Sequence, residues 1–143
     1  MRVFYHYMVI TAMTLLYASS STAADLRAYV NQYFQGKALE YGFGSGTSSN
    51  NPRVVAVTHY CTSGYYYSIG QSCRPNIIAR GYQCSPYRDD GNWSLKVQGQ
   101  QATLFWTSTT YGPGNFPIYV RNDGVFVDPR GNAFIYAGEA QCY

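Results

Sequence analysis

Histidine and cysteine are the side chains of this sequence that could act as base or nucleophile, and they are few. The chain holds 2 His and 4 Cys in 143 residues. His6 falls in an N-terminal segment that we expect to be removed, so a Ser–His or Cys–His dyad would have to use His59. His59 stands in a predicted strand, two residues before Cys61. That position favours a structural histidine over a catalytic one.

Carboxylates are the other candidates, because acid–base hydrolysis needs a pair of them. The acidic residues considered are Glu40, Asp89, Asp90, Asp123, Asp128 and Glu139. Asp123 and Asp128 stand beside Gly or Pro, where Asp bonds to the backbone of a turn. Residues 89–92 lack the alternating oxygen spacing of an EF-hand loop, so we expect an acidic turn there. We predict no metal site and no cofactor.

The four cysteines are Cys61, Cys73, Cys84 and Cys142. An even number in an exported domain predicts two disulfides, for which three pairings exist. We expect the pairing with separate loops, Cys61–Cys73 and Cys84–Cys142. Either way, a bond to Cys142 would hold the C-terminus against fraying.

The first 24 residues have the layout of a secretory signal peptide. A positive charge at Arg2 precedes a short apolar run (residues 8–17), and small residues follow at 21–24. The run is about half the ~20 residues that a membrane-spanning helix needs. We therefore predict cleavage after Ala23 or Ala24, a single domain over 25–143, and a secreted or periplasmic protein without a membrane span.

Composition limits the partners. Lys and Arg number 10 and Asp and Glu 7, and the basic residues are scattered singly, which does not indicate nucleic-acid binding. Only 12% of residues are charged while 17% are aromatic, including 16 Tyr. Tyrosine serves both in cores and at contact surfaces, so composition alone does not separate these uses.

One helix and several strands are predicted. Residues 25–38 carry the apolar stripe of an amphipathic helix, with Asp25 as N-cap and a glycine-rich loop over 42–52 behind it. Residues 53–61 predict a central strand buried on both faces, and 64–70 its hairpin partner. Residues 71–91 look irregular, because they contain Pro75 and Pro86.

Residues 92–136 predict an antiparallel meander, since side chains alternate along short strands and Asn-Asp-Gly at 122–124 is a turn signal. The predicted fold is a single α+β domain, with an N-terminal helix packed on a twisted antiparallel β-meander sheet that two disulfides staple. An all-β sandwich or small barrel with a peripheral helix is the alternative.

A binding surface is predicted on the sheet face opposite the core. The residues expected in the core are Trp93, Leu95, Val97, Leu104, Trp106, Ile118 and Val120. The candidate binding residues are Tyr65, Tyr66, Tyr67, Phe105, Tyr119, Arg121 and Phe126. Rigid aromatic side chains with an arginine are typical anchors for a partner.

We therefore expect a non-catalytic binding protein that recognises a glycan or an extracellular or periplasmic protein. A small secreted hydrolase built on scattered carboxylates and an inhibitor of a secreted enzyme are the alternatives. The sequence leaves the oligomeric state open.

Overall fold

The computed structural model describes residues 23–143, so nearly all of the predicted signal segment lies outside the described residues. The elements are α1 (Ala23–Phe34), β1 (Lys37–Phe43), β2 (Arg53–Tyr60), β3 (Tyr65–Asn76), β4 (Gly81–Gln98), β5 (Gln101–Ser108), β6 (Gly112–Val120), β7 (Phe126–Val127) and β8 (Ile135–Glu139). The strands form one sheet in the order β7-β6-β5-β4-β3-β2-β1-β8. The strands from β1 to β7 therefore follow one another as a meander, which is longer than the one predicted over residues 92–136. The last predicted strand, at residues 133–136, was wrongly placed, because β8 pairs with β1 at the other edge.

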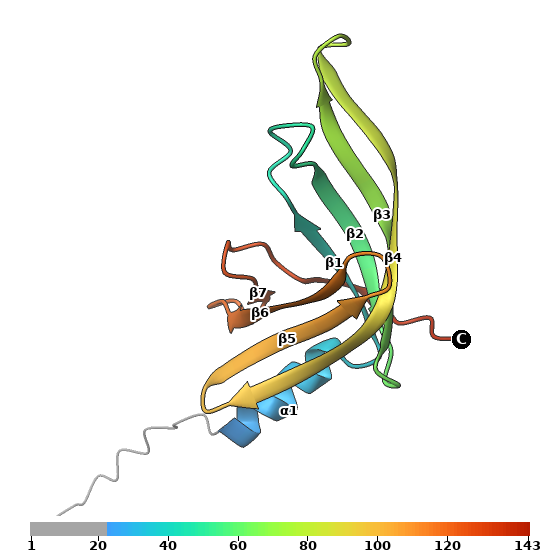
Figure 1. The fold of residues 1–143 in the computed structure, drawn as a ribbon. Coiled ribbons are helices and arrows are strands. Elements are labelled where there is room, and N and C mark those ends of the chain that lie inside the picture. The colour runs from blue at the N-terminus through green and yellow to red at the C-terminus, as the bar shows by residue number, and fades with distance from the viewer. Residues whose placement is uncertain (1–22) are drawn as a thin grey trace, which may run out of the picture.

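The sheet curls strongly, into a half-barrel (Figure 1). Tyr41 on β1 and Phe116 on β6 have ring centroids 6.1 Å apart, although four strands separate β1 from β6 in the sheet. The chain between β7 and β8 crosses from one edge of the sheet to the other, and the Phe134 amide donates to the Phe126 carbonyl at 2.9 Å. The curl therefore creates a concave face that residues from both edges share.

Helix α1 lies on this concave face and fills part of it (Figure 1). Val30 and Phe34 on the predicted apolar stripe are fully buried. The Tyr33 ring meets Phe126 at 4.9 Å, and its hydroxyl donates to the Phe134 carbonyl at 2.6 Å. The stripe thus packs on the sheet as the sequence indicates.

The helix ends earlier than predicted. Gly36 has a φ of 70°, a left-handed conformation that glycine adopts readily and that commonly terminates helices. Lys37 to Phe43, expected to be the end of the helix and the start of a loop, instead form strand β1 between β2 and β8. The prediction was wrong because the stop signal at Gly36 was overlooked in favour of the glycines after Gly42.

The segment 71–91 is not irregular, since β3 and β4 form one long hairpin through it. This register places Cys73 opposite Cys84, and the two are bonded. Cys61 is bonded to Cys142. Two disulfides are present as predicted, but the expected pairing was wrong, because Pro75 and Pro86 concealed the hairpin that brings two of the cysteines together.

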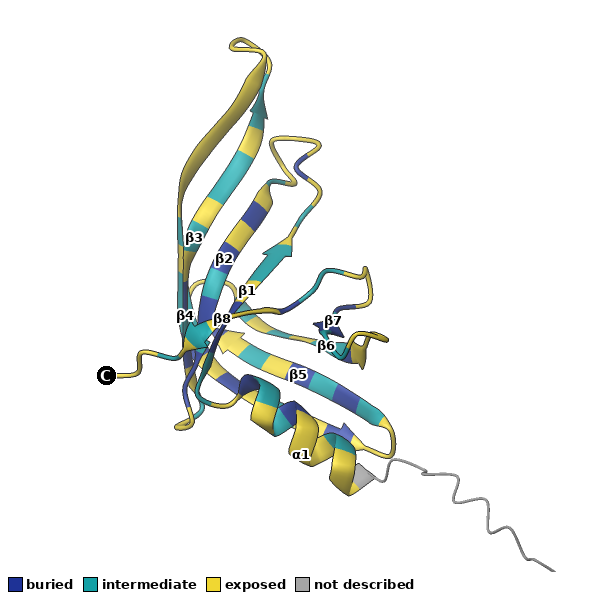
Figure 2. Cartoon of the chain, turned by 180° about the vertical axis from the view of Figure 1, so that it is seen from behind, coloured by how far each residue is buried: buried dark blue, intermediate teal, exposed yellow. Residues whose placement is uncertain are grey.

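Beyond the last pairing of β3 with β2, at Cys73, the hairpin projects from the sheet as an arm formed by residues 73–84 (Figure 2). At its tip Ile77 and Ile78 are 92% and 98% exposed. By contrast, β2 alternates buried and exposed residues, so it is not buried on both faces as predicted. Its outward residue Val55 is exposed while Val54 and Ala56 are buried.

The architecture is thus mostly antiparallel β, with one short helix and two disulfides. The helix-on-meander arrangement is present, but the single 12-residue helix is a minor part of it. Within residues 23–143, no helix is long and apolar enough to cross a bilayer.

Candidate functional site

The part of the concave face that α1 leaves uncovered forms a groove of about 470 Å³. Small-molecule sites commonly have volumes of roughly 300–1,000 Å³ and mainly apolar linings. The lining residues come from β1 to β6 and the segments beside them: Tyr41, Phe43, Pro52, Val54, Thr58, Tyr60, Tyr66, Ser68, Tyr87, Asp89, Leu104, Trp106, Ser108, Tyr111, Phe116 and Phe134. Nine of these sixteen side chains are aromatic.

The wall of the groove is a continuous series of aromatic contacts. The centroid distances are 5.0 Å for Trp106–Phe116, 6.1 Å for Phe116–Tyr41, 5.8 Å for Tyr41–Phe43, 6.0 Å for Phe43–Tyr87 and 6.5 Å for Tyr87–Tyr111. Aromatic pairs at such distances stabilise one another beyond simple burial. The wall is therefore a connected surface whose rings support one another.

Trp106 owes its position to a glycine on the neighbouring strand. Gly114 is directly opposite Trp106 in the β5–β6 register, and a β-carbon at Gly114 would overlap the indole. The indole therefore lies against bare backbone on β6. This close approach fixes the largest ring of the groove without covering it.

Asp89, on β4, supplies the carboxylate of the groove. Tyr66 donates its hydroxyl proton to Asp89 Oδ2 at 2.7 Å, and Ser108 donates to Oδ1 at 2.5 Å. Burial, together with the hydrogen bond to Asp89, raises the pKa of Tyr66, so this hydroxyl stays a donor. Burial and the nearby Asp89 charge likewise raise the pKa of Tyr87.

A second buried carboxylate, Asp128, supports the wall from behind. Tyr41 donates to Asp128 Oδ2 at 2.6 Å, and Asn132 donates through both its amide groups. Burial acts to raise the pKa of Asp128, but the hydrogen bonds from Asn132 and Tyr41 outweigh it and hold the pKa below its ordinary value. Asp128 therefore acts as an acceptor that positions Tyr41.

The predicted binding residues do not form one surface. Tyr66 faces the groove, while Tyr65, Tyr67, Phe105 and Tyr119 belong to the convex face. Alternation along a strand requires this separation of Tyr66 from its two neighbours. Most of the predicted site thus lies on the opposite side of the sheet from the groove.

Two further predicted residues are placed elsewhere. Phe126 is fully buried under α1, because the register pairs it directly with Val120 and so turns it to the concave side. It was expected on the face opposite Val120, and Val120 itself is 45% exposed rather than core. Arg121 lies beyond β6 and forms an ion pair with Asp123 at 2.6 Å.

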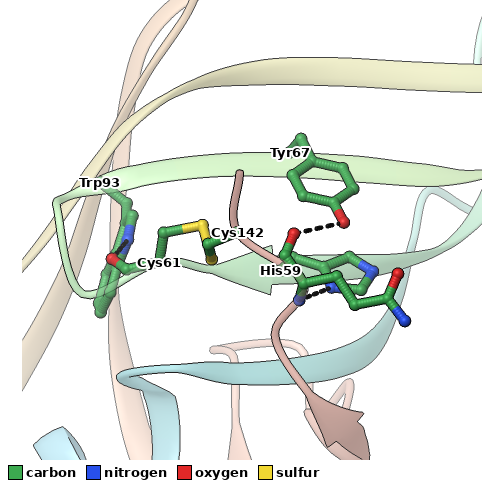
Figure 3. Close-up of a disulfide and its surroundings, with 6 residues drawn as sticks. His59, Cys61, Tyr67, Trp93 and Cys142 are labelled. Carbon is green, nitrogen blue, oxygen red and sulfur yellow. Dashed lines mark hydrogen bonds between the residues drawn. A yellow bond between two sulfur atoms is a disulfide. The ribbon is translucent and has the colours of Figure 1, made fainter.

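His59 lies away from the groove, beside the Cys61–Cys142 disulfide (Figure 3). Its ring stacks on Tyr67 at 4.4 Å, and its Nδ1 accepts the Gln141 amide at 3.1 Å. Tyr67 donates to the Gln141 carbonyl at 2.7 Å. Burial lowers the pKa of His59. These contacts hold the C-terminal segment.

The acidic turn expected at residues 89–92 is wrong, since these residues lie inside β4. Asp89 faces the groove and Asp90 the convex side, where Thr109 Oγ1 donates to Asp90 Oδ1 at 2.9 Å. Two carboxylates on opposite faces of a strand do not act as an acid–base pair. No cluster of three or more His, Cys, Asp or Glu side chains suited to a metal occurs among residues 23–143.

Sequence reasoning missed most of the groove. Tyr41 was assigned to no element, Phe43 to a loop and Tyr87 to an irregular segment, whereas all three lie in strands. Trp106 was expected in the core, and it does face the concave side but is only partly buried. The available signal was alternation across β4, where Tyr87, Asp89 and Gly91 continue the pattern of Trp93 and Leu95.

Comparison with protein-family models finds no match, and searches of curated proteins and of solved structures likewise find none. The function must therefore be inferred from the geometry of the groove.

Proposed function

We propose that this protein is an exported, non-catalytic binding protein that holds a small, largely apolar ligand in the concave groove. The observation that carries the proposal is an aromatic groove of about 470 Å³ on the part of the sheet that α1 leaves uncovered. Apolar side chains left without a covering element normally mark a contact site. Here the uncovered rings are also held in place by one another.

Export is supported by the two disulfides, which persist in oxidising compartments, and by the signal-like pattern of residues 1–24. A binding role is supported by the hydrogen bonding of the polar groups. Thr58 and Ser68 bond to each other at 2.7 Å, and Tyr66 and Ser108 are engaged with Asp89. Each of these hydroxyls therefore has a hydrogen-bonding partner within the chain, and His59, which could have served as a base for a nucleophile, does not line the groove.

A glycan is the second candidate ligand. Sugar rings stack their apolar faces on aromatic planes, and Tyr111 at the rim is 68% exposed and parallel to Tyr87. A protein partner would have to insert an extended segment or a side chain between these rings. We rank both below a small apolar ligand, because few polar groups face the groove and four of them, the hydroxyls of Thr58, Ser68, Tyr66 and Ser108, are already hydrogen-bonded.

The test is a titration of the protein with N-phenyl-1-naphthylamine, a neutral dye whose emission rises in apolar surroundings. We expect saturable binding with a dissociation constant of about 10–100 µM, an affinity that is typical of an apolar ligand of this size. Trp106→Ala should weaken binding about tenfold or more, because it removes the largest ring of the wall.

Tyr82→Ala is the matched control, because Tyr82 is an exposed aromatic residue of the arm that does not line the groove. Its affinity should stay within about twofold of the parent. Absence of saturable dye binding, or equal losses from Trp106→Ala and Tyr82→Ala, would contradict the proposed function.

A further inference from the structure

Asp89 is the one acidic or basic residue among the side chains that line the groove within residues 23–143. It lies in the middle of β4, opposite Ser68 of β3. The surrounding lining is dominated by rings. A carboxylate in such surroundings loses hydration, which is unfavourable unless other groups compensate for it.

Hydrogen bonds fix this carboxylate as an acceptor. The Ser108 hydroxyl oxygen receives the Thr110 and Tyr111 amides at 3.1 and 2.9 Å, so its proton is directed to Asp89. The Tyr66 hydroxyl directs its proton to the other carboxylate oxygen. Asp89 thus accepts one hydrogen bond on each of its two carboxylate oxygens.

No basic side chain forms an ion pair with Asp89 within the described part of the chain. The ion pairs there are Lys37–Glu139 and Arg121–Asp123, and neither involves the groove. Each carboxylate oxygen can accept more than one hydrogen bond, so Asp89 retains acceptor capacity beyond Tyr66 and Ser108. The groove therefore holds a negative charge with room for a donor from outside the chain.

Aromatic rings line the same groove as this charge. Tyr87 precedes Asp89 by two residues on the same face of β4, and Trp106 precedes Ser108 in the same way on β5. Tyr111 follows Ser108 by three residues and donates its backbone amide to the Ser108 hydroxyl. The faces of such rings carry negative electrostatic potential and attract cations within about 6 Å.

We propose that the groove selects an organic cation, a protonated or quaternary amine on an apolar body, with Asp89 as its counter-ion and Tyr87, Trp106 and Tyr111 as its aromatic enclosure. This inference rests on the proposed function, since it names the ligand class of the same groove. In a purely structural role, Asp89 would serve only to link β3 to β5 through its two hydrogen bonds. A neutral acceptor would make the same link without leaving a charge unbalanced. An inorganic cation would need several oxygen ligands in place of rings.

The test is a charge series built on one ring: tyramine (cation), 4-ethylphenol (neutral) and 4-hydroxyphenylacetate (anion), each titrated calorimetrically into the full-length protein. We expect tyramine to bind about tenfold more tightly than 4-ethylphenol, and the anion to bind most weakly. Added salt should weaken the binding of tyramine and leave that of 4-ethylphenol nearly unchanged.

Asp89→Asn should remove the preference for tyramine, because the amide keeps the shape and an acceptor for Tyr66 but not the charge. Asp90→Asn is the matched control, with the same charge change at the next residue on the convex face, and it should keep the preference.

If Asp89→Asn fails to fold, the charge series and its salt dependence in the unmodified protein decide whether the groove selects a cation. Tyramine binding no tighter than 4-ethylphenol, including binding of neither, would overturn the cation inference. Dye binding in that same protein would still uphold the groove as a site, whereas its absence would overturn both.

Discussion

The concave face of the sheet has two halves that are built from similar residues and end up differently. In the half under α1, Val30, Phe34 and Phe126 have no exposed surface. In the open half, rings of the same kinds line a groove. The two tryptophans show the same contrast. Trp93 of the covered half is 7% exposed and donates a hydrogen bond to the Cys61 carbonyl, whereas Trp106 lines the groove of the open half.

The covering element, α1, therefore decides which rings belong to the core and which form a site. A 12-residue helix is too short to cover the whole curled face. The carboxylate of Asp89 and the paired hydroxyls of Thr58 and Ser68 belong to the open half, where a ligand or water can reach polar groups. Variants that change one half and spare the other test this division.

Phe34→Ala should have the largest effect, because it empties the centre of the covered half. Truncating a fully buried Phe typically lowers the free energy of unfolding by about 3–5 kcal/mol. Phe34 contacts Tyr60, Phe126 and Phe134 at centroid distances of 5.2, 5.8 and 5.2 Å, so the cavity would be shared by several rings. Urea denaturation followed by circular dichroism measures the loss, and a loss below about 1 kcal/mol would show that this half is not a closed core.

Removing the Cys61–Cys142 disulfide should come next. It closes a loop with a sequence separation of 81 and adjoins Trp93 of the covered half, whereas Cys73–Cys84 spans only 11 residues within the arm. We expect a loss of about 2–4 kcal/mol from Cys61→Ala/Cys142→Ala and a smaller loss from Cys73→Ala/Cys84→Ala. Melting temperatures of the two double variants provide the comparison. A larger fall in melting temperature on removal of Cys73–Cys84 would contradict the expectation that the covered half contributes most of the stability.

Trp106→Ala should lower the free energy of unfolding by only about 1–2 kcal/mol, because the ring is partly exposed. The dye affinity should nevertheless fall strongly, as proposed above. Phe105→Ala, on the convex face predicted from the sequence, should leave that affinity unchanged. If Phe105→Ala weakens binding while Trp106→Ala does not, the site belongs to the convex face and the groove assignment fails.

The smallest effect should come from pH. Burial lowers the pKa of His59 in the folded protein, so the neutral form is favoured there and its contribution to stability is complete above the unfolded pKa of about 6.5. As the pH falls through the lowered pKa, protonation removes the acceptor for the Gln141 amide and this contribution is lost. Melting temperatures between about pH 8 and about pH 5 should therefore decline more in the parent than in His59→Gln.

This pH window separates His59 from Asp128, whose pKa lies below the ordinary carboxyl value. His59→Gln should also leave dye binding intact, because His59 does not line the groove. An equal decline in both proteins would show that His59 does not secure the C-terminal segment through its neutral form.

Much of the fold was predictable because local patterns and tertiary packing agree. The stripe of α1, the strand at 53–60 and the alternation from Trp93 onward are set by burial on one face, and the structure contains all three. Strand β1 and the long hairpin were not predicted, since Gly42, Pro75 and Pro86 suggest loops locally and the pairing partners are supplied only by neighbouring strands.

The groove was harder to predict for a different reason. Its wall joins Tyr41 of β1 to Phe116 of β6, a contact that exists only after the sheet curls. Alternation places Asp89 on the same face as Trp93, but it does not reveal that α1 covers Trp93 and stops short of Asp89. Which part of a face remains open depends on helix length and position, and a residue pattern does not encode these directly.

The most direct test of the central claim uses the two tryptophans as reporters of the two halves. Trp93→Phe leaves Trp106 as the sole tryptophan, and Trp106→Phe leaves Trp93. During titration with N-phenyl-1-naphthylamine, we predict saturable quenching of Trp106 emission in the first variant, with the same midpoint as the rise in dye emission, and weaker quenching of Trp93 in the second. Quenching that is absent from the Trp106-only protein, or stronger in the Trp93-only protein, would contradict the assignment of the open half as the ligand site.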